Sequence, residues 1–230
     1  MTGYFVAIPT YWTYPGGEGP EEIVFDHPTP LDSPGTLRRT LESLTSMAAA
    51  GAEVGVVAAA TAPGLEAAVE DRVREVMESP PLPYPVRLFA ASHLGILQDF
   101  CRSRGRAEWL PLLSLAGYAQ IRNLTLLLAT ISGAPALISL DDDEVIADPD
   151  FLAKVDEDLE VLGREHPVFG LAGIYRDKDG GILLPEPAAP WAVYWPKMRW
   201  MNAALTELAL TGPRLKPTYL GFGGNLALPA

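Results

Sequence analysis

The chain has 230 residues, of which 48% are hydrophobic and 20% are charged, a balance typical of a globular protein with a sizeable core. Asp and Glu outnumber Lys and Arg by 29 to 17, and so acidic a composition argues against nucleic acid as a partner. The single cysteine excludes an intrachain disulfide. We find no signal-peptide pattern and no apolar run near the roughly 20 residues of a transmembrane segment, and therefore expect a cytoplasmic protein.

Apolar runs alternate with amphipathic stretches along most of the chain. This alternation predicts an α/β fold with a mostly parallel, twisted sheet and helices on both faces. Strands are expected over 4–8, 53–60, 86–90 and 136–140, and helices over 34–50, 63–79 and 118–132. The last of these helices should bury a stripe of Ile121, Leu124, Leu128 and Ile131. Residues 11–35 are rich in Gly, Pro and acids and are expected to form a long loop, while residues 93–116 carry no assignable pattern.

The chain beyond residue 147 is less regular. Asp148 and Pro149 predict the start of a helix that buries Phe151, Val155 and Leu159. We also expect a strand over 168–175, a turn over 177–181 that leads into 182–184, and a helix over 202–210. An aromatic stretch lies between these elements, where it forms either a packed contact or a platform for a sugar or apolar acceptor: Trp191, Tyr194, Trp195 and Trp200.

Four consecutive acids, Asp141 to Glu144, follow the expected strand 136–140. Adjacent carboxylates repel one another and lose solvation near a core, and a divalent cation removes both penalties. In an extended segment alternate side chains share a face, so we expect Asp141 and Asp143 to point the same way. The alternative is a solvated loop that caps the next helix, although Asp148 already serves as that cap. The four acids therefore predict a site for Mn²⁺ or Mg²⁺ on Asp141 and Asp143 at the carboxyl end of a strand.

Several motifs along the chain resemble the family 2-like GT-A glycosyltransferases. Gly117-Tyr-Ala-Gln-Ile-Arg-Asn123, a helix, and then Ala136-Leu-Ile-Ser-Leu-Asp-Asp-Asp-Glu144 resemble the family's Arg-Asn pair and Asp-x-Asp motif. Ile8-Pro9-Thr10-Tyr11 is similar to the family's first nucleotide-contacting turn, and Gly223-Gly224-Asn225 to a loop after its acceptor region. The resemblance implies a metal-dependent glycosyltransferase of the hexosyltransferase class, which uses a nucleoside-diphosphate sugar as donor.

The resemblance also implies roles for particular residues. Asp141 would face the ribose or diphosphate of the donor and share the metal with Asp143, which would ligate the ion that bridges the diphosphate. Arg122 would hold the acids or the phosphates. The expected donor-binding residues are Pro9, Thr10, Thr61, Arg122, Asp141 and Asp142. The acceptor, whether saccharide, lipid or small molecule, stays open. We expect one GT-A domain over 1–230, with a nucleotide-binding part over about 1–147 and an acceptor-side part over about 148–230.

Two features depart from the family pattern and leave alternatives open. Family members often carry a base-contacting acid where this chain has Val57-Ala-Ala-Ala-Thr61. Inverting members usually take their general base from beyond the Gly-Gly-Asn loop, and this sequence stops five residues after Asn225. We therefore expect a C-terminal truncation and assign no catalytic residue. The alternatives are a non-catalytic GT-A-like nucleotide-binding module, and a haloacid dehalogenase-like phosphatase, whose motif Leu140-Asp-Asp-Asp-Glu-Val145 also fits.

Overall fold

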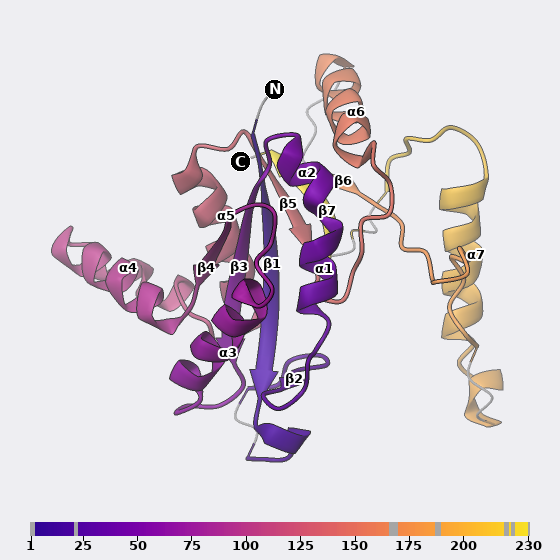
Figure 1. The fold of residues 1–230 in the computed structure, drawn as a ribbon. Helices are drawn as coiled ribbons and strands as arrows, with labels where there is room; N and C mark the ends of the chain where they lie inside the picture. Colours follow the sequence, from indigo (N-terminus) through magenta and orange to yellow (C-terminus); the bar gives the residue numbers. More distant parts are fainter. Residues whose placement is uncertain are drawn as a thin grey trace.

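The centre of the molecule is a mixed sheet of seven strands (Figure 1). The structure is a computed structural model that describes residues 3–20, 23–165, 170–186, 190–218, 221 and 224–229. The strands are β1 (Tyr4–Thr13), β2 (Thr29–Pro30), β3 (Glu53–Ala60), β4 (Val86–Phe89), β5 (Ala136–Leu140), β6 (Leu171–Ala172) and β7 (Asn225–Pro229). Their order is β4-β3-β1-β5-β7-β6, and β2 pairs with β1 off this path. Strands β1 to β5 pair in parallel, whereas β7 is antiparallel to β5 and β6. The predicted α/β class with a mostly parallel sheet is confirmed.

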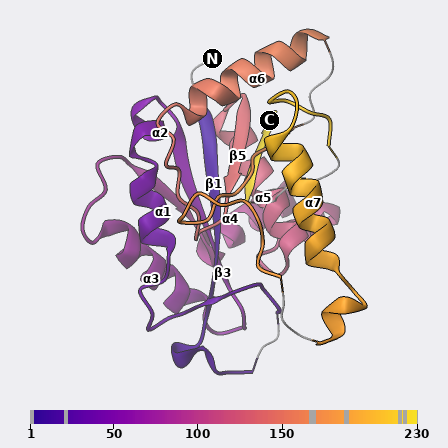
Figure 2. The ribbon, with the colours of Figure 1, turned by 90° about the vertical axis from the view of Figure 1, so that its right-hand side faces the viewer.

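Helices cover both faces of the sheet (Figure 2). The α-helices are α1 (Leu37–Ser43), α2 (Thr45–Ala49), α3 (Glu66–Glu78), α4 (Ala91–Ser103), α5 (Tyr118–Ser132), α6 (Phe151–Glu165) and α7 (Lys197–Leu210). Three short 3₁₀ helices are η1 (Pro15–Gly17), η2 (Ala107–Leu112) and η3 (Pro190–Val193). Buried side chains of α1, α2, α3 and α6 pack on one face, and those of α5 pack on the other. None of the described helices has the length and apolar character needed to cross a membrane.

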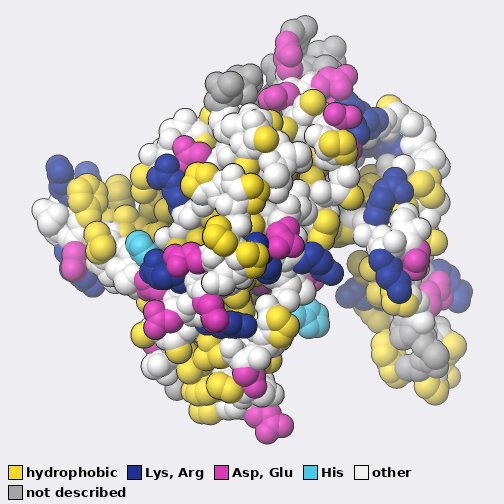
Figure 3. Space-filling view, viewed as in Figure 1, with side chains coloured by type: hydrophobic (Ala, Val, Ile, Leu, Met, Phe, Trp, Pro, Cys, Tyr) yellow, Lys and Arg dark blue, Asp and Glu magenta, His cyan; other side chains and the backbone are white. Residues whose placement is uncertain are grey.

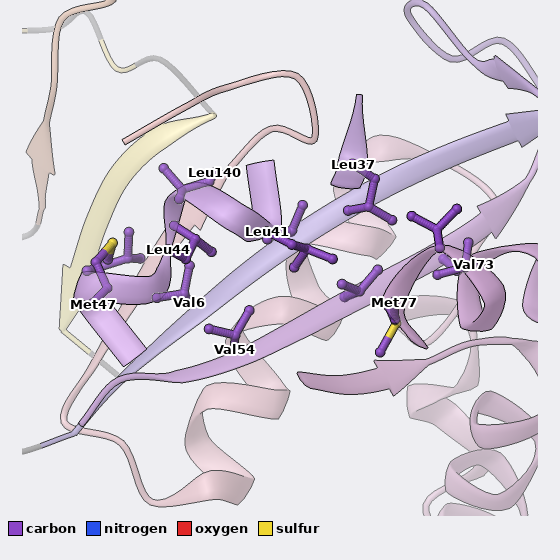
Figure 4. Packing of buried hydrophobic residues seen from close by; sticks show 14 of the residues in the cluster. Val6, Leu37, Leu41, Leu44, Met47, Val54, Val73, Met77 and Leu140 are labelled. Atoms are coloured by element: carbon purple, nitrogen blue, oxygen red, sulfur yellow. The ribbon is translucent and has the colours of Figure 1, made fainter. Parts of the chain in front are cut away.

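The core forms around β1, which is buried along its whole length. Its side chains point alternately to the two faces of the sheet. Val6 and Ile8 pack with α1 and α3, whereas Phe5 and Ala7 pack with α5. Figure 4 shows the first of these layers, in which Leu37, Leu41 and Leu44 meet Val6, Val54 and Leu140. A parallel strand covered on both faces is expected to be apolar throughout, which explains why β1 lacks the alternation of a half-exposed strand.

The first strand is longer than predicted. We expected it to stop before Pro9, but β1 continues to Thr13 and pairs with β3 as far as Trp12. Proline removes one backbone donor and is tolerated where a strand lacks a partner on one edge. On its other edge β1 pairs with β5 only through Ala7, so Pro9 lies beyond the last β5 contact. The expected loop over 11–35 accordingly contains the end of β1, together with η1 and β2.

The helices differ from the sequence analysis in two further places. Residues 93–116 had no assignable pattern, yet they include most of α4 and all of η2. On α5, Ile131 is 64% exposed rather than buried, and Ala129 and Thr125 face the core instead. The helix turns by about 100° per residue, so its buried stripe drifts away from Ile131 towards its C-terminal end. The helix ends at Gly133, whose φ of 74° is the left-handed conformation expected of a C-cap glycine.

The chain after α6 differs most from expectation. Of the strand predicted over 168–175, residues 168–169 lie outside the described part, and the remainder forms only the two-residue β6. Residues 182–184 form no strand. The last apolar residues instead form β7, which lies between β5 and β6. Helix α7 begins at Lys197, before the predicted start, and Figure 1 shows it standing beside the sheet.

Candidate functional site

The predicted acids lie where the chain topology reverses direction. From β1 the chain passes to β3 by way of α1 and α2 on one face, and it returns to β5 by way of α5 on the other. The carboxyl ends of β1 and β5 therefore form a topological switch point, which is where open α/β sheets bind ligands. On this edge β1 meets β5 only up to Ala7 and meets β2 at Trp12 and Thr13. Residues 8–11 have no strand partner there within the described chain.

Asp141 to Glu144 form a turn, which we call the acidic turn. β5 ends at Leu140, and the amide of Glu144 donates to the carbonyl of Asp141 at 3.3 Å. The expectation of an extended segment is therefore wrong, whereas the shared face of Asp141 and Asp143 stays a prediction. The carboxylates of Asp141, Asp142 and Glu144 contact different elements, and Asp143 is the exposed member of the four.

Asp141 faces the side of the sheet covered by α5. Arg122, in the second turn of that helix, donates from Nη2 to Oδ1 of Asp141 at 3.0 Å, and its Nη1 contacts the buried hydroxyl of Ser139. Ser139 and Asp141 are two residues apart, so β5 directs both towards the same helix. Arg122 therefore contacts the first of the four acids, in agreement with the expectation that it holds them, and the pair fixes the orientation of the Asp141 carboxylate.

Asp142 faces the opposite side and is held by β1 and α1. The hydroxyl of Thr10 donates to Oδ2 of Asp142, and the indole of Trp12 donates to Thr10 at 2.9 Å. From α1, Thr40 donates to the carbonyl of Asp142 at 2.7 Å and Arg39 to the carbonyl of Asp143 at 2.7 Å. Burial raises the pKa of Asp142 to about 6; the Thr10 hydrogen bond opposes this shift, and the neighbouring carboxylates add to it.

Residues next to the C-terminal strands β6 and β7 also contact the acidic turn. Burial raises the pKa of Glu144 to about 8, the charges of Asp141 and Asp143 add to this shift, and a hydrogen bond from Tyr175 opposes it. A Cβ atom at Gly224 would lie 2.1 Å from Oδ2 of Asp141 and 2.8 Å from Oε1 of Glu144. Only glycine leaves room for both carboxylates at this position. The motif Gly223-Gly224-Asn225 thus touches the site through Gly224, while Gly223 lies outside the described residues.

Tyr11 was not among the predicted site residues. Its ring stacks on Phe25 with centroids 4.3 Å apart and meets the edge of Tyr118 at 5.4 Å. The phenol oxygen is buried and has no hydrogen-bond partner among the described residues. Burial raises its pKa; the Arg122 charge opposes this shift, and Asp141 is among the groups that add to it. A buried hydroxyl without a partner beside an ion pair is a polar group available to a ligand. In the sequence, only its position directly after Thr10 could have indicated that Tyr11 lies at the site.

The residues predicted to bind the donor lie in two separate places, at the acidic turn and at the end of β3. Thr10 and Arg122 contact the acidic turn, and Pro9 precedes Thr10 on β1. Thr61 is buried after β3 and donates to the Thr13 hydroxyl at 3.0 Å. Thr13 is the third residue after Thr10 on β1, which places it about 10 Å further along the strand. The predicted contact of Pro9 and Thr61 with a nucleotide stays a prediction.

A cavity of about 250 Å³ opens beyond the carboxyl ends of β3 and β4. Its lining is mostly small and apolar and includes Ala60, Ala62, Pro63 and Ser114. Neither Thr61 nor the residues of the acidic turn line it. This cavity and the acidic turn are therefore separate features on the carboxyl side of the sheet.

The carboxylates of the acidic turn suit a cation that takes some of its ligands from a bound phosphate or water, and not one that the protein surrounds completely. In the described part of the chain, no group of three or more His, Cys, Asp or Glu side chains is arranged to hold a metal ion. Mg²⁺, however, typically takes one or two carboxylates and completes its shell with phosphate oxygens and water. Asp141 and the exposed Asp143 could supply such a pair, and a nearby cation would lower the raised pKa values of Asp142 and Glu144. The predicted metal site stays a prediction.

No protein-family model matches this sequence, and no curated protein matches it either.

Proposed function

We propose that the chain is a metal-dependent glycosyltransferase of the GT-A type, which binds a nucleoside-diphosphate sugar at the acidic turn. One observation carries the proposal: Arg122 and Thr10 orient Asp141 and Asp142 at the switch point between β1 and β5. Each carboxylate is fixed by a partner from a different element. The exposed Asp143 directly follows Asp142 in the sequence. Such an arrangement supports ligand binding at the carboxyl edge of the sheet.

Electrostatics favours a diphosphate bound together with a cation. The charged carboxylates of the acidic turn would repel a diphosphate, and the guanidinium groups of Arg122 and Arg39 are already bound to Asp141 and to the carbonyl of Asp143. A divalent ion held by Asp141 and Asp143 would neutralise the charge of these two carboxylates. The bound ion would supply charge neutralisation on the departing diphosphate oxygens.

The chain's own residues then have defined tasks. Arg122 fixes the Asp141 carboxylate and can reach a phosphate oxygen with its remaining donors. Thr10 fixes the orientation of the Asp142 carboxylate through its hydrogen bond. The hydroxyl of Tyr11, which has no hydrogen-bond partner among the described residues, is available to the donor. The sugar acceptor and the catalytic base stay unassigned.

The test is a thermal-shift series of nucleoside diphosphates and nucleotide sugars, with and without Mn²⁺. One nucleoside diphosphate should raise Tm only in the presence of the metal, because a ligand that binds only the folded state stabilises it. Asp143→Asn should abolish this metal-dependent shift, with little change in the Tm of the free protein because Asp143 is exposed. Asp148→Asn is the matched control, since Asp148 pairs with Lys154 outside the acidic turn.

The outcomes separate the candidate functions. If no nucleoside diphosphate shifts Tm with Mn²⁺, or if Asp143→Asn responds as the wild type does, the proposal fails. Binding without sugar transfer to any acceptor would favour the non-catalytic module. A trapped aspartyl-phosphate would instead favour the haloacid dehalogenase-like alternative, in which an aspartate is phosphorylated.

A further inference from the structure

The aromatic stretch before and within α7 is exposed rather than packed. We call residues 190–200 the aromatic tip. Trp191, Trp195 and Trp200 are between 58% and 59% exposed, and Tyr194 is 87% exposed. Figure 3 shows hydrophobic side chains gathered at the lower right, at the end of the column formed by α7. Exposed aromatic rings of this number in one short segment mark an interaction site.

The charge of this region differs in sign from that of the whole chain. Residues 190–218 contain four Lys and Arg against one Glu, in a chain with a net charge of −12. Within the aromatic tip, Lys197 and Arg199 are both exposed, and no acid occurs. Arg199 lies 3.8 Å from Glu186, a long and mostly exposed ion pair that leaves its charge accessible. The aromatic tip therefore combines indole rings with cations.

The backbone of the aromatic tip satisfies many of its own polar groups. The amide of Tyr194 donates to the carbonyl of Trp191 at 3.0 Å, and that of Lys197 to Trp195 at 2.8 Å. The amide of Trp200 donates to Pro196 at 3.2 Å. A segment with internal backbone hydrogen bonds can enter an environment poor in water without leaving these donors unpaired. The rings of Trp195 and Trp200 stand edge to face, 6.2 Å apart, so they form no parallel slot for a flat ligand.

We propose that the aromatic tip docks the protein on the surface of a phospholipid bilayer. Indole and phenol rings suit the bilayer interface because one part of the ring is apolar and another is polar. Lys197 and Arg199 can extend towards the phosphate groups of the lipids while their stems stay beside the rings. A saccharide is the poorer match, since the tip contains no Asn, Gln, Asp, Glu, Ser or Thr to bind sugar hydroxyls. The inference is independent of the proposed transferase function.

The experiment is flotation of the full chain with two kinds of vesicle, phosphatidylcholine alone and phosphatidylcholine mixed with phosphatidylglycerol. The wild type should bind both, more tightly to the mixed vesicles, and the difference should shrink as salt is added. Trp195→Ala/Trp200→Ala should reduce partitioning by about tenfold or more on both vesicles. Lys197→Gln/Arg199→Gln should remove the preference for the mixed vesicles and leave binding to phosphatidylcholine.

Trp109→Ala is the matched control, because Trp109 is also exposed, at 50%, but lies on η2. It should bind vesicles as the wild type does, and far-UV circular dichroism should show that every variant keeps the wild-type fold. Absence of wild-type binding to both vesicles would overturn the proposal, as would equal losses from Trp109→Ala and the double tryptophan variant. The alternative partner of the aromatic tip is a second copy of the chain, and sedimentation velocity tests it. If the wild type self-associates but does not bind vesicles, and the double tryptophan variant is monomeric, the tip is a contact between copies and the membrane proposal is wrong.

Discussion

The helices and strands of residues 4–140 surround side chains that are wholly removed from solvent, such as Val6, Leu41 and Ile138. In residues 170–218, by contrast, Leu205 is the one buried residue among those that the structure describes. The two regions therefore differ in what holds them. Burial of apolar side chains stabilises the first region directly. The second depends on backbone pairing through β6 and β7 and on polar contacts.

Matched leucine truncations should show this difference most strongly. Leu41→Ala in the core should lower the free energy of unfolding by about 2–5 kcal/mol, because it leaves a cavity in a packed layer. Leu205→Ala in α7 should cost about 1 kcal/mol or less in the same experiment, since it affects a region that can open locally. Urea unfolding followed by far-UV circular dichroism measures both. Equal losses would mean that the two regions share one cooperative core.

Gly224 lies against the acidic turn, which follows the first region, and its substitution should have the next largest effect. Gly224→Ala would push a methyl group into the carboxylates of Asp141 and Glu144. Asp141 would have to move away from Arg122, at an expected cost of about 1–3 kcal/mol in stability. Gly221→Ala is the control, because a Cβ there meets no atom of the described residues within 4 Å. If the two variants have the same Tm, the close approach of β7 to the acidic turn is not required for folding.

The raised pKa of Glu144 predicts a pH-dependent stability. Its pKa is about 8 in the folded protein against the ordinary value of 4.5 for a glutamate, so the folded state binds more protons between these pH values. Stability contributed by this group should therefore fall as pH rises from about 4.5 to 8. Glu144→Gln lacks the ionisation and should gain on the order of 1 kcal/mol over wild type at pH 8.5, but nothing at pH 4. Thermal unfolding in EDTA across this range measures the difference, and a pH-independent gain would contradict it.

The smallest expected effect concerns the polar contact between α6 and residue Arg214. Its guanidinium contacts both Glu157, at 3.2 Å, and Asp158. Arg214→Gln should change global stability by about 0.5 kcal/mol or less, because exposed ion pairs contribute little. Limited proteolysis should nevertheless cleave residues 190–218 faster in the variant. Unchanged cleavage would show that other contacts hold this region against α6.

Much of the first 140 residues could be predicted from the sequence. The bounds of β3 and β5 agree with the predicted strands, because their runs are continuously apolar and end in polar or turn-forming residues. The extension of β1 to Thr13 was missed because Pro9 reads as a strand terminator. Only the ending of β5 beside it explains why that proline is tolerated.

The candidate site, too, could be predicted only in part from the sequence. A run of four acids after a buried strand predicted that Asp141, Asp142 and Asp143 lie at a ligand-binding edge, and the contact of Arg122 with the first of them agrees with expectation. The turn geometry could not be predicted, because it depends on hydrogen bonds from Arg39 and Thr40, about a hundred residues earlier in the chain.

The sequence by itself determined the α/β class, the buried strands and the place of the acids at the end of one of them, because these follow from the local spacing of apolar and charged residues. Tertiary structure alone decided which side chains surround each acid. It brought Tyr175 and Gly224 to Glu144 through the β6–β7 pairing, and it left the rings of the aromatic tip in solvent. Contacts between distant segments depend on the packing of whole elements, which local spacing does not encode.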